Sequence, residues 1–282
     1  MTNELYHIHI TSRRKWTDLR LGEVWRYRDL IWLMTKRSFT VSYKQTILGP
    51  AWLIINPLLS SIVYSVVFGR IAGLSTEGLP RLLFYLTGSA IWAFFSTCLT
   101  GNASVFVNNA SLFGKVYFPR LAVPVANVLS AVIRFLIQLL LVLLVFLFYL
   151  LRGQVQLHPA GWLLIPVILL QLGLMGMGCG IIVSSLTTKY RDLSVLVSFF
   201  TSLWMYATPV VYPLSQVTET GLQKLMLLNP VTAPVELFRR AVLGVGTAEP
   251  LALIWSWAFT ILVLVIGVLL FNRIEKNFMD TV

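Results

Sequence analysis

Long apolar stretches alternate with short polar breaks along most of this chain. A hydrocarbon core roughly 30 Å thick requires about 20 predominantly apolar residues for each spanning helix. The pattern therefore predicts an all-α integral membrane protein with six transmembrane helices. The predicted spans cover residues 52–68, 82–107, 123–151, 162–186, 193–209 and 251–271.

An amphipathic segment precedes the first predicted span. Apolar side chains between residues 21 and 39 recur at the spacing of one helical face, while charged side chains fall elsewhere. The apolar set is Val24, Tyr27, Leu30, Ile31 and Met34, and the charged set is Arg26, Asp29 and Arg37. This periodicity predicts an interface helix along the membrane surface, which serves either as a simple anchor or also as a contact for a cytoplasmic partner.

The segment from about 212 to 244 is too polar and proline-rich to span, yet it contains two short helical patterns. Thr218 followed by Glu219 can cap the first helix. Asn229 and Pro230 suit the N-cap and first turn of the second helix, which is expected to end at Gly244. The pattern predicts short re-entrant helices before the last span.

The two adjacent arginines in this segment can be interpreted in two ways. Glu236 precedes Arg239 and Arg240 by three and four residues, so a local ion pair explains them on helical spacing alone. The functional alternative is that the paired helices dip into the outer leaflet as a gate. The residues assigned to this outer gate are Tyr212, Asn229, Pro230, Arg239 and Arg240.

Composition and charge agree with a polytopic membrane protein. Of 282 residues, 57% are hydrophobic and 12% charged, whereas a soluble domain carries about a quarter charged residues. The net charge of +11 concentrates before the first span and in alternate loops, which places both termini in the cytoplasm. We expect a cytoplasmic N-terminal segment over 1–49, a transmembrane domain over 50–272 in contact with membrane lipids, and a cytoplasmic tail over 273–282. Nucleic acid is not an expected partner, because the basic residues flank apolar spans and no recognition motif accompanies them.

Catalytic patterns do not occur in the sequence. It contains no Gly-x-x-x-x-Gly-Lys-[Ser/Thr] phosphate loop, no His-Glu-x-x-His pattern and no pair of carboxylates placed for acid–base work. We therefore expect no enzymatic activity, cofactor or metal in this chain. Gly176 and Gly180 form a small-xxx-small pair within the fourth predicted span, which indicates close helix packing.

Arg134 is the clearest ionisable residue inside a predicted span. Ion-coupled carriers usually place several ionisable groups there, so one arginine without a carboxylate argues against a proton- or sodium-driven carrier. The structural interpretation of Arg134 is that it packs against a neighbouring helix and bonds to its carbonyl groups, or that its side chain extends toward a membrane interface.

Several motifs, in order along nearly the whole chain, resemble those of the permease subunits of polysaccharide ABC exporters. They are Arg26-Tyr27-Arg28-Asp29-Leu30, the run from Tyr43 to Trp52, Asn56-Pro57-Leu58, Lys189-Tyr190-Arg191-Asp192-Leu193, the run from Thr208 to Pro213, and Leu228-Asn229-Pro230. The resemblance is strongest to the O-antigen type, with capsular polysaccharide and teichoic acid permeases as relatives. It implies a homodimer in the bacterial inner membrane that exports lipid-linked polysaccharide. It also implies two separate ATP-binding subunits, which bind the ATP and Mg.

The resemblance gives roles to residues at the inner loops and within the spans. Short cytoplasmic loops are the right size to couple an ATPase to the spans, although positive-inside charge alone would explain Lys189 and Arg191. The residues expected to couple to the ATPase are Tyr190, Arg191, Asp192, Lys115, Tyr117, Arg28 and Asp29. Aromatic rings suit the flat apolar faces of sugars, although many rings simply mark membrane interfaces or fill helix contacts. The residues expected to line the substrate pathway are Tyr64, Phe68, Phe199, Phe200, Trp204 and Tyr206.

Two other functions compete with polysaccharide export. A related ABC permease could export a small drug or lipid. A membrane-embedded enzyme is disfavoured by the missing acid–base and metal-binding sets.

Overall fold

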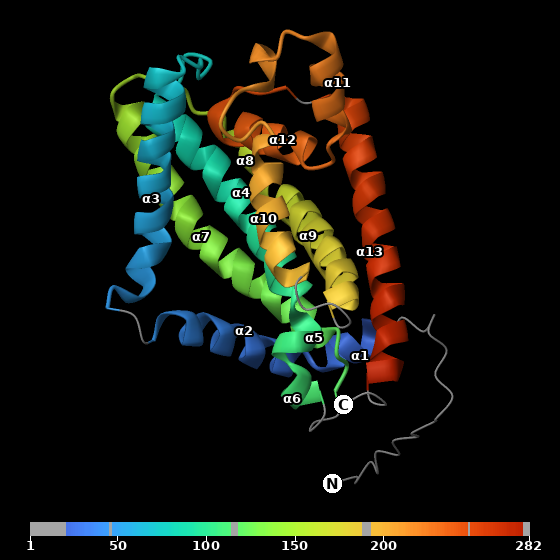
Figure 1. Ribbon diagram of the computed structural model, residues 1–282. Helices are drawn as coiled ribbons and strands as arrows, with labels where there is room; N and C mark the ends of the chain where they lie inside the picture. The colour runs from blue at the N-terminus through green and yellow to red at the C-terminus, as the bar shows by residue number, and fades with distance from the viewer. Residues whose placement is uncertain (1–20, 45–46, 114–117, 188–192, 248, 279–282) are drawn as a thin grey trace.

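The computed structural model describes residues 21–44, 47–113, 118–187, 193–247 and 249–278. Regular secondary structure within these ranges is helical, which confirms the predicted fold class (Figure 1). The elements are α1 (Leu21–Arg26), α2 (Arg28–Tyr43), η1 (Gly49–Ala51), α3 (Trp52–Tyr64), η2 (Ser65–Ile71), α4 (Arg81–Ala103), α5 (Val105–Asn108), α6 (Ala110–Phe113), α7 (Ala122–Leu151), α8 (Pro159–Trp162), α9 (Ile165–Thr187), α10 (Leu193–Tyr206), η3 (Leu214–Gln216), α11 (Thr220–Leu228), α12 (Thr232–Leu243) and α13 (Pro250–Phe278).

Five helical segments are long and apolar enough to cross a membrane within the described ranges. They are 49–71, 81–103, 122–151, 159–187 and 250–274, so the chain is a multi-pass membrane protein. The predicted span that is missing from this set, residues 193–209, corresponds to α10, whose 14 residues extend about 21 Å at 1.5 Å per residue. This is shorter than the hydrocarbon core, and the chain turns directly after it. Six full spans therefore remain a prediction.

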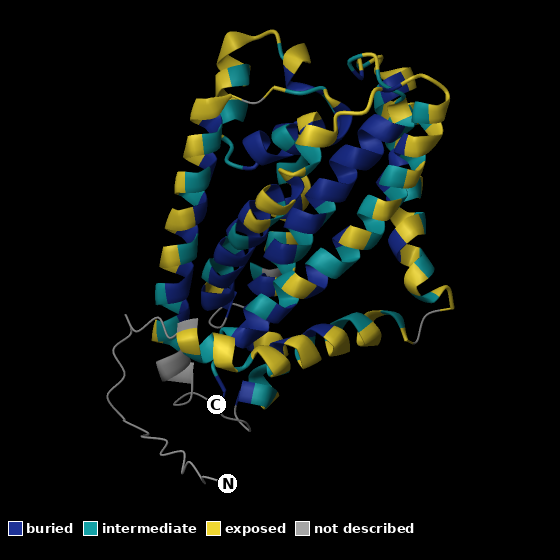
Figure 2. Ribbon diagram, turned by 180° about the vertical axis from the view of Figure 1, so that it is seen from behind, coloured by how far each residue is buried: buried dark blue, intermediate teal, exposed yellow. Residues whose placement is uncertain are grey.

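Helix α4 lies at the centre of the bundle, where α7, α9 and α10 pack around it (Figure 1). Most of its residues are buried, whereas α3, α7 and α13 expose an outward stripe of side chains (Figure 2). Such a stripe on an outer helix suits contact with lipid or with another protein surface.

Glycines allow α9 to approach its two neighbours closely. A Cβ atom on Gly180 would lie 2.5 Å from the carbonyl oxygen of Leu99, and one on Gly176 would lie 2.7 Å from the Cβ of Cys98, both on α4. On the other side, a Cβ on Gly178 would lie 2.8 Å from the backbone nitrogen of Leu264 on α13. The predicted packing role of Gly176 and Gly180 is confirmed.

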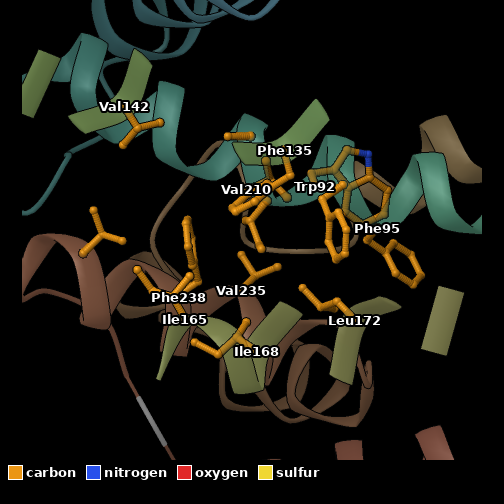
Figure 3. Packing of buried hydrophobic residues seen from close by; sticks show 14 of the residues in the cluster. Trp92, Phe95, Phe135, Val142, Ile165, Ile168, Leu172, Val210, Val235 and Phe238 are labelled. Carbon is orange, nitrogen blue, oxygen red and sulfur yellow. The ribbon is translucent and has the colours of Figure 1, made fainter. Parts of the chain in front are cut away.

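The hydrophobic core extends into α12, which is wedged among α4, α8 and α9. Ten of its twelve residues are buried. Val235 and Phe238 lie among Phe135, Ile168 and Leu172 in the packed cluster (Figure 3). Helix α12 is therefore part of the interior of the bundle rather than a peripheral flap.

The interface helix begins as α1 and continues as α2 across one end of the bundle, nearly perpendicular to the long helices (Figure 1). Its predicted apolar face exists, but this face packs on protein: Ile31 is buried in a cluster with Phe106, Phe113 and Phe271. The opposite face exposes Trp25. The hydrophobic periodicity located the face correctly, and this face meets protein; the position of the helix along the membrane surface stays a prediction.

The two ends of the bundle carry different elements. Helices α1, α2, α5, α6 and the end of α13 lie together, and α11 and α12 lie at the opposite end (Figure 1). The predicted tail after the last span is partly helical, because α13 continues to Phe278. We call the end that carries α11 and α12 the distal end.

Candidate functional site

Helix α10 presents two contrasting faces. Its inward face carries Val197, Thr201 and Trp204, which pack toward α4 and α9. Its outward face exposes a series of large apolar and aromatic side chains. These are Leu196, Phe199, Phe200, Leu203 and Tyr206.

Three of the predicted pathway residues lie on the outward face of α10. Phe199 and Phe200 are 58% and 62% exposed, and their ring centroids are 6.0 Å apart. Tyr206 is half exposed about two turns further along this face. These rings are open to a ligand, a lipid or a second protein surface.

Trp204 has a structural role that the sequence did not indicate. Its ring packs edge-on against Phe95 with the centroids 5.4 Å apart, and its Nε1 donates a hydrogen bond to Oδ1 of Asn229 at 3.0 Å. Its indole donor is therefore already used within the chain.

The remaining pathway residues lie on the first span. Tyr64 ends α3 and Phe68 lies in the π-helical turn η2, with ring centroids 5.9 Å apart. The Tyr64 hydroxyl donates to Sδ of Met205 on α10 at 3.8 Å. Tyr64 therefore contacts α10 through Met205. Phe199 and Phe200, by contrast, lie on the outward face of that helix.

A turn at residues 228–230 connects three helices at the distal end. Asn229 uses its whole carboxamide: Oδ1 accepts from Trp204 and from the backbone N–H of Val231, and Nδ2 donates to Ala207 O and Thr208 Oγ1 at 3.0 and 2.9 Å. Because these bonds hold Asn229 to the end of α10, it does not serve as the N-cap that the sequence predicts. That position belongs to Val231, and α12 begins at Thr232.

The same turn is held from the other side by α13. Ser256 donates to the carbonyl oxygen of Pro230 at 2.6 Å and accepts from Nε2 of Gln171 on α9 at 2.7 Å. The indole of Trp255 donates to the carbonyl oxygen of Leu228 at 2.8 Å. The turn therefore links α9, α10 and α13, and its buried polar groups have partners.

A largely apolar pocket of about 540 Å³ lies between α10 and α11 beside this turn. Two sequence-predicted sets meet here, because Trp204 and Tyr206 of the pathway set and Asn229 and Pro230 of the gate set all line it. The remaining lining residues are Ala207, Leu222, Leu225 and Met226.

A buried ion pair fixes α12 to the segment that follows α10. Arg239 contacts Glu236, and its Nη2 donates to the carbonyl oxygens of Pro209 and Val210 at 2.6 and 3.2 Å. Its guanidinium carbon also lies 4.3 Å from the ring centroid of Phe84 on α4. The predicted ion pair is confirmed for Arg239, whereas Arg240 is exposed.

The predicted end of α12 and the predicted start of α11 have different outcomes. Gly244 closes the helix in the left-handed conformation at φ +77°, as predicted. Helix α11 begins after Glu219 without a side-chain cap, so the predicted capping by Thr218 or Glu219 is wrong. Tyr212 donates its hydroxyl to the carbonyl oxygen of Tyr206 at 2.8 Å, so this gate residue also joins the end of α10 to the segment after it.

The predicted coupling residues are only partly within the described ranges. Arg28 and Asp29 are exposed on the outward face of α2, at the end of the bundle opposite to α11 and α12. Tyr190, Arg191, Asp192, Lys115 and Tyr117 lie outside the described residues.

The sequence pattern does not reveal the residues that surround Arg239 and Asn229 at the distal end. Phe84, Phe95, Gln171, Trp255 and Ser256 complete the contacts around Arg239 and Asn229. They lie inside apolar spans and are far from their partners in sequence, so no local pattern marks them. Within the described ranges, no cluster of three or more His, Cys, Asp or Glu side chains could hold a metal ion.

The fold and its distal end define a multi-pass membrane protein in which the short helix α12 is buried within the bundle. The chain belongs to the ABC-2 type transporter family, whose membrane domain matches residues 29–243. It is similar to the O-antigen export system permease protein RfbA of Klebsiella pneumoniae, with 27% identity over 254 residues that cover 89% of this chain and 94% of that protein. It is also similar to the protein of the same name from Myxococcus xanthus, with 31% identity over 214 residues that cover 75% and 79% of the two chains.

Proposed function

We propose that this chain is the transmembrane permease subunit of an ABC exporter for lipid-linked polysaccharide of the O-antigen type. In this proposal two copies assemble with two ATP-binding subunits in the bacterial inner membrane. Both termini and α2 face the cytoplasm, and the distal end faces outward. The partner subunits bind ATP and Mg and supply the energy.

The observation that carries the proposal is the outward face of α10. Phe199, Phe200 and Tyr206 alternate there with the small polar residues Ser198 and Ser202. Rings can stack on the apolar C–H faces of sugars, and nearby polar groups can meet their hydroxyls. A polymer must slide through its pathway, so several weak contacts suit transport better than one tight site. The names of the similar proteins support the same substrate class.

The ATP requirement provides the first test. We expect the purified chain to hydrolyse no ATP above a protein-free control, because the sequence contains no phosphate loop. The complex with its ATP-binding subunit should hydrolyse ATP, and a strain lacking the chain should regain surface polysaccharide when both subunits are supplied. Hydrolysis by the isolated chain would contradict the division of labour proposed here.

The aromatic face provides a second test. Phe199→Ala, Phe200→Ala and Tyr206→Ala should each reduce export mildly, and the triple variant should reduce it much more, because weak contacts act together. Trp204 stays unchanged, since its indole supports the fold. The measurements are surface polysaccharide in the complemented deletion strain and co-purification of the ATP-binding subunit.

Two exposed leucines on the same face provide a matched control. Leu196→Ala and Leu203→Ala remove apolar area but no ring, so the double variant should export normally. Equal loss in the leucine and aromatic variants would show that the face serves packing rather than sugar contact. Normal polysaccharide export by the aromatic triple variant, with loss of export of a small drug or lipid, would support the competing permease function.

A further inference from the structure

Arg134 lies in the first half of α7, yet its side chain contacts the far end of the interface helix. Its Nη2 donates a hydrogen bond to Oγ of Ser42 at 3.0 Å, and its guanidinium carbon lies 5.7 Å from the ring centroid of Tyr43. Ser42 and Tyr43 form the last turn of α2. A cation from a predicted span therefore meets the terminus of the helix that crosses the base of the bundle.

A second contact between α2 and α7 lies about two turns earlier in each helix. Thr35 is fully buried, and its hydroxyl lies 3.4 Å from the carbonyl oxygen of Ala126 on α7. From there the two helices diverge toward the base of α3 (Figure 1). A long side chain suits the wider part of this wedge, and Arg134 provides it.

The electrostatic setting favours the Arg134 contact. The last carbonyl groups of a helix carry partial negative charge, and a cation beside them stabilises the terminus. The last turn of α2 has no basic residue of its own. Lys44 follows at the C-cap position, and Arg134 adds a second positive charge from another helix.

We infer that Arg134 is a positioning residue that anchors the C-terminal turn of α2 to α7, so that the two helices move as one body. This inference rests on the proposed function for its consequence: an ATP-binding subunit that pushes on the exposed face of α2 would displace α7 as well. Without the anchor, the end of α2 would detach and absorb the displacement before it reached the long helices.

Hydrogen–deuterium exchange on the purified full-length chain tests the anchor without any substrate. A hydrogen bond to a charged group contributes enough that its loss corresponds to about tenfold faster exchange at residues 40–44 in Arg134→Ala. Arg134→Lys should retain most of the protection, and Ser42→Ala should lose part of it. Arg152→Ala is the matched control, because it removes the same charge from the exposed end of α7, where Arg152 contacts only the ring of Phe148 among the aromatic residues described. Equal exchange in Arg134→Ala and Arg152→Ala would overturn the inference.

The assembled transporter gives the functional readout. In Arg134→Ala, ATP hydrolysis should continue at close to the normal rate while surface polysaccharide falls, since the pushing step is intact and its transmission is lost. In the double variant Ser42→Cys with Arg134→Cys, in a background without Cys98 and Cys179, a flexible thiol-reactive crosslinker between the two introduced thiols should restore export. If hydrolysis and export fell together and the crosslink restored neither, the anchor would be a folding contact only. Failure of the unaltered chain to export polysaccharide would refute the proposed function, and the exchange experiment would still decide on the anchor.

Discussion

Replacing Arg239 with alanine is expected to destabilise the distal end severely. The substitution leaves Glu236 as a buried carboxylate without its cation and removes the donors to the carbonyl groups of Pro209 and Val210. Breaking a buried pair by removing one partner costs about 3–5 kcal/mol. The expected result is a large fall in the amount of folded protein recovered in mild detergent and in its thermal unfolding temperature.

The neighbouring arginine gives a matched control. Arg240→Ala removes the same side chain from an exposed position one residue away, so it should leave the unfolding temperature nearly unchanged. The double variant Glu236→Leu with Arg239→Met should recover much of the loss, because an apolar pair of similar volume leaves no buried charge unpaired. Similar stability of Arg239→Ala and Arg240→Ala would show that the ion pair does not hold α12 in place.

Adding a single methyl group to Gly180 is expected to separate α4 from α9. The new Cβ would lie 2.5 Å from the carbonyl oxygen of Leu99 and 2.6 Å from the Cβ of Asn102, so the backbones must move apart. Overpacking of this kind costs about 1–3 kcal/mol, and leucine at the same position should cost more. Thermal unfolding of the purified variants measures the effect.

Gly101 on α4 provides the opposite case. A Cβ there meets no atom within 4 Å, so Gly101→Ala should raise stability by about 0.5–1 kcal/mol through the better helix propensity of alanine. Opposite signs for the two glycine-to-alanine changes would support close packing as the reason for Gly180. Stabilisation by both changes would refute it.

The predictable part of the fold follows from the cost of apolar side chains in water and of unpaired backbone groups in lipid. These two costs make a long apolar run a helix, and the predicted span 123–151 differs from α7 by one residue at its start. The packing role of Gly176 and Gly180 on α9 was equally predictable, since only a residue without a side chain permits such close contact. Spacing along one helix also predicted the contact between Glu236 and Arg239.

The unpredicted part depends on which helix lies beside which. Hydropathy does not distinguish a ring that faces outward, such as Phe199, from one that packs inward, such as Trp204. The face of α2 was likewise identified correctly, but periodicity alone cannot say whether that face meets lipid or protein. The partners of Asn229 and Arg134 lie on other helices, so only the assembled bundle reveals them.

The residue that follows Asn229 also protects it chemically. Asparagine deamidates when the backbone nitrogen of the next residue, having lost its hydrogen, attacks the side-chain carbonyl carbon and expels ammonia. The succinimide ring that forms then hydrolyses to aspartate or isoaspartate. Pro230 has no backbone N–H, so this route to deamidation is closed at residue 229. An aspartate there would place an oxygen where Nδ2 now donates to the carbonyl of Ala207 and the hydroxyl of Thr208. The Asn-Pro pair therefore closes this route to the loss of the Nδ2 donor at the junction of helices.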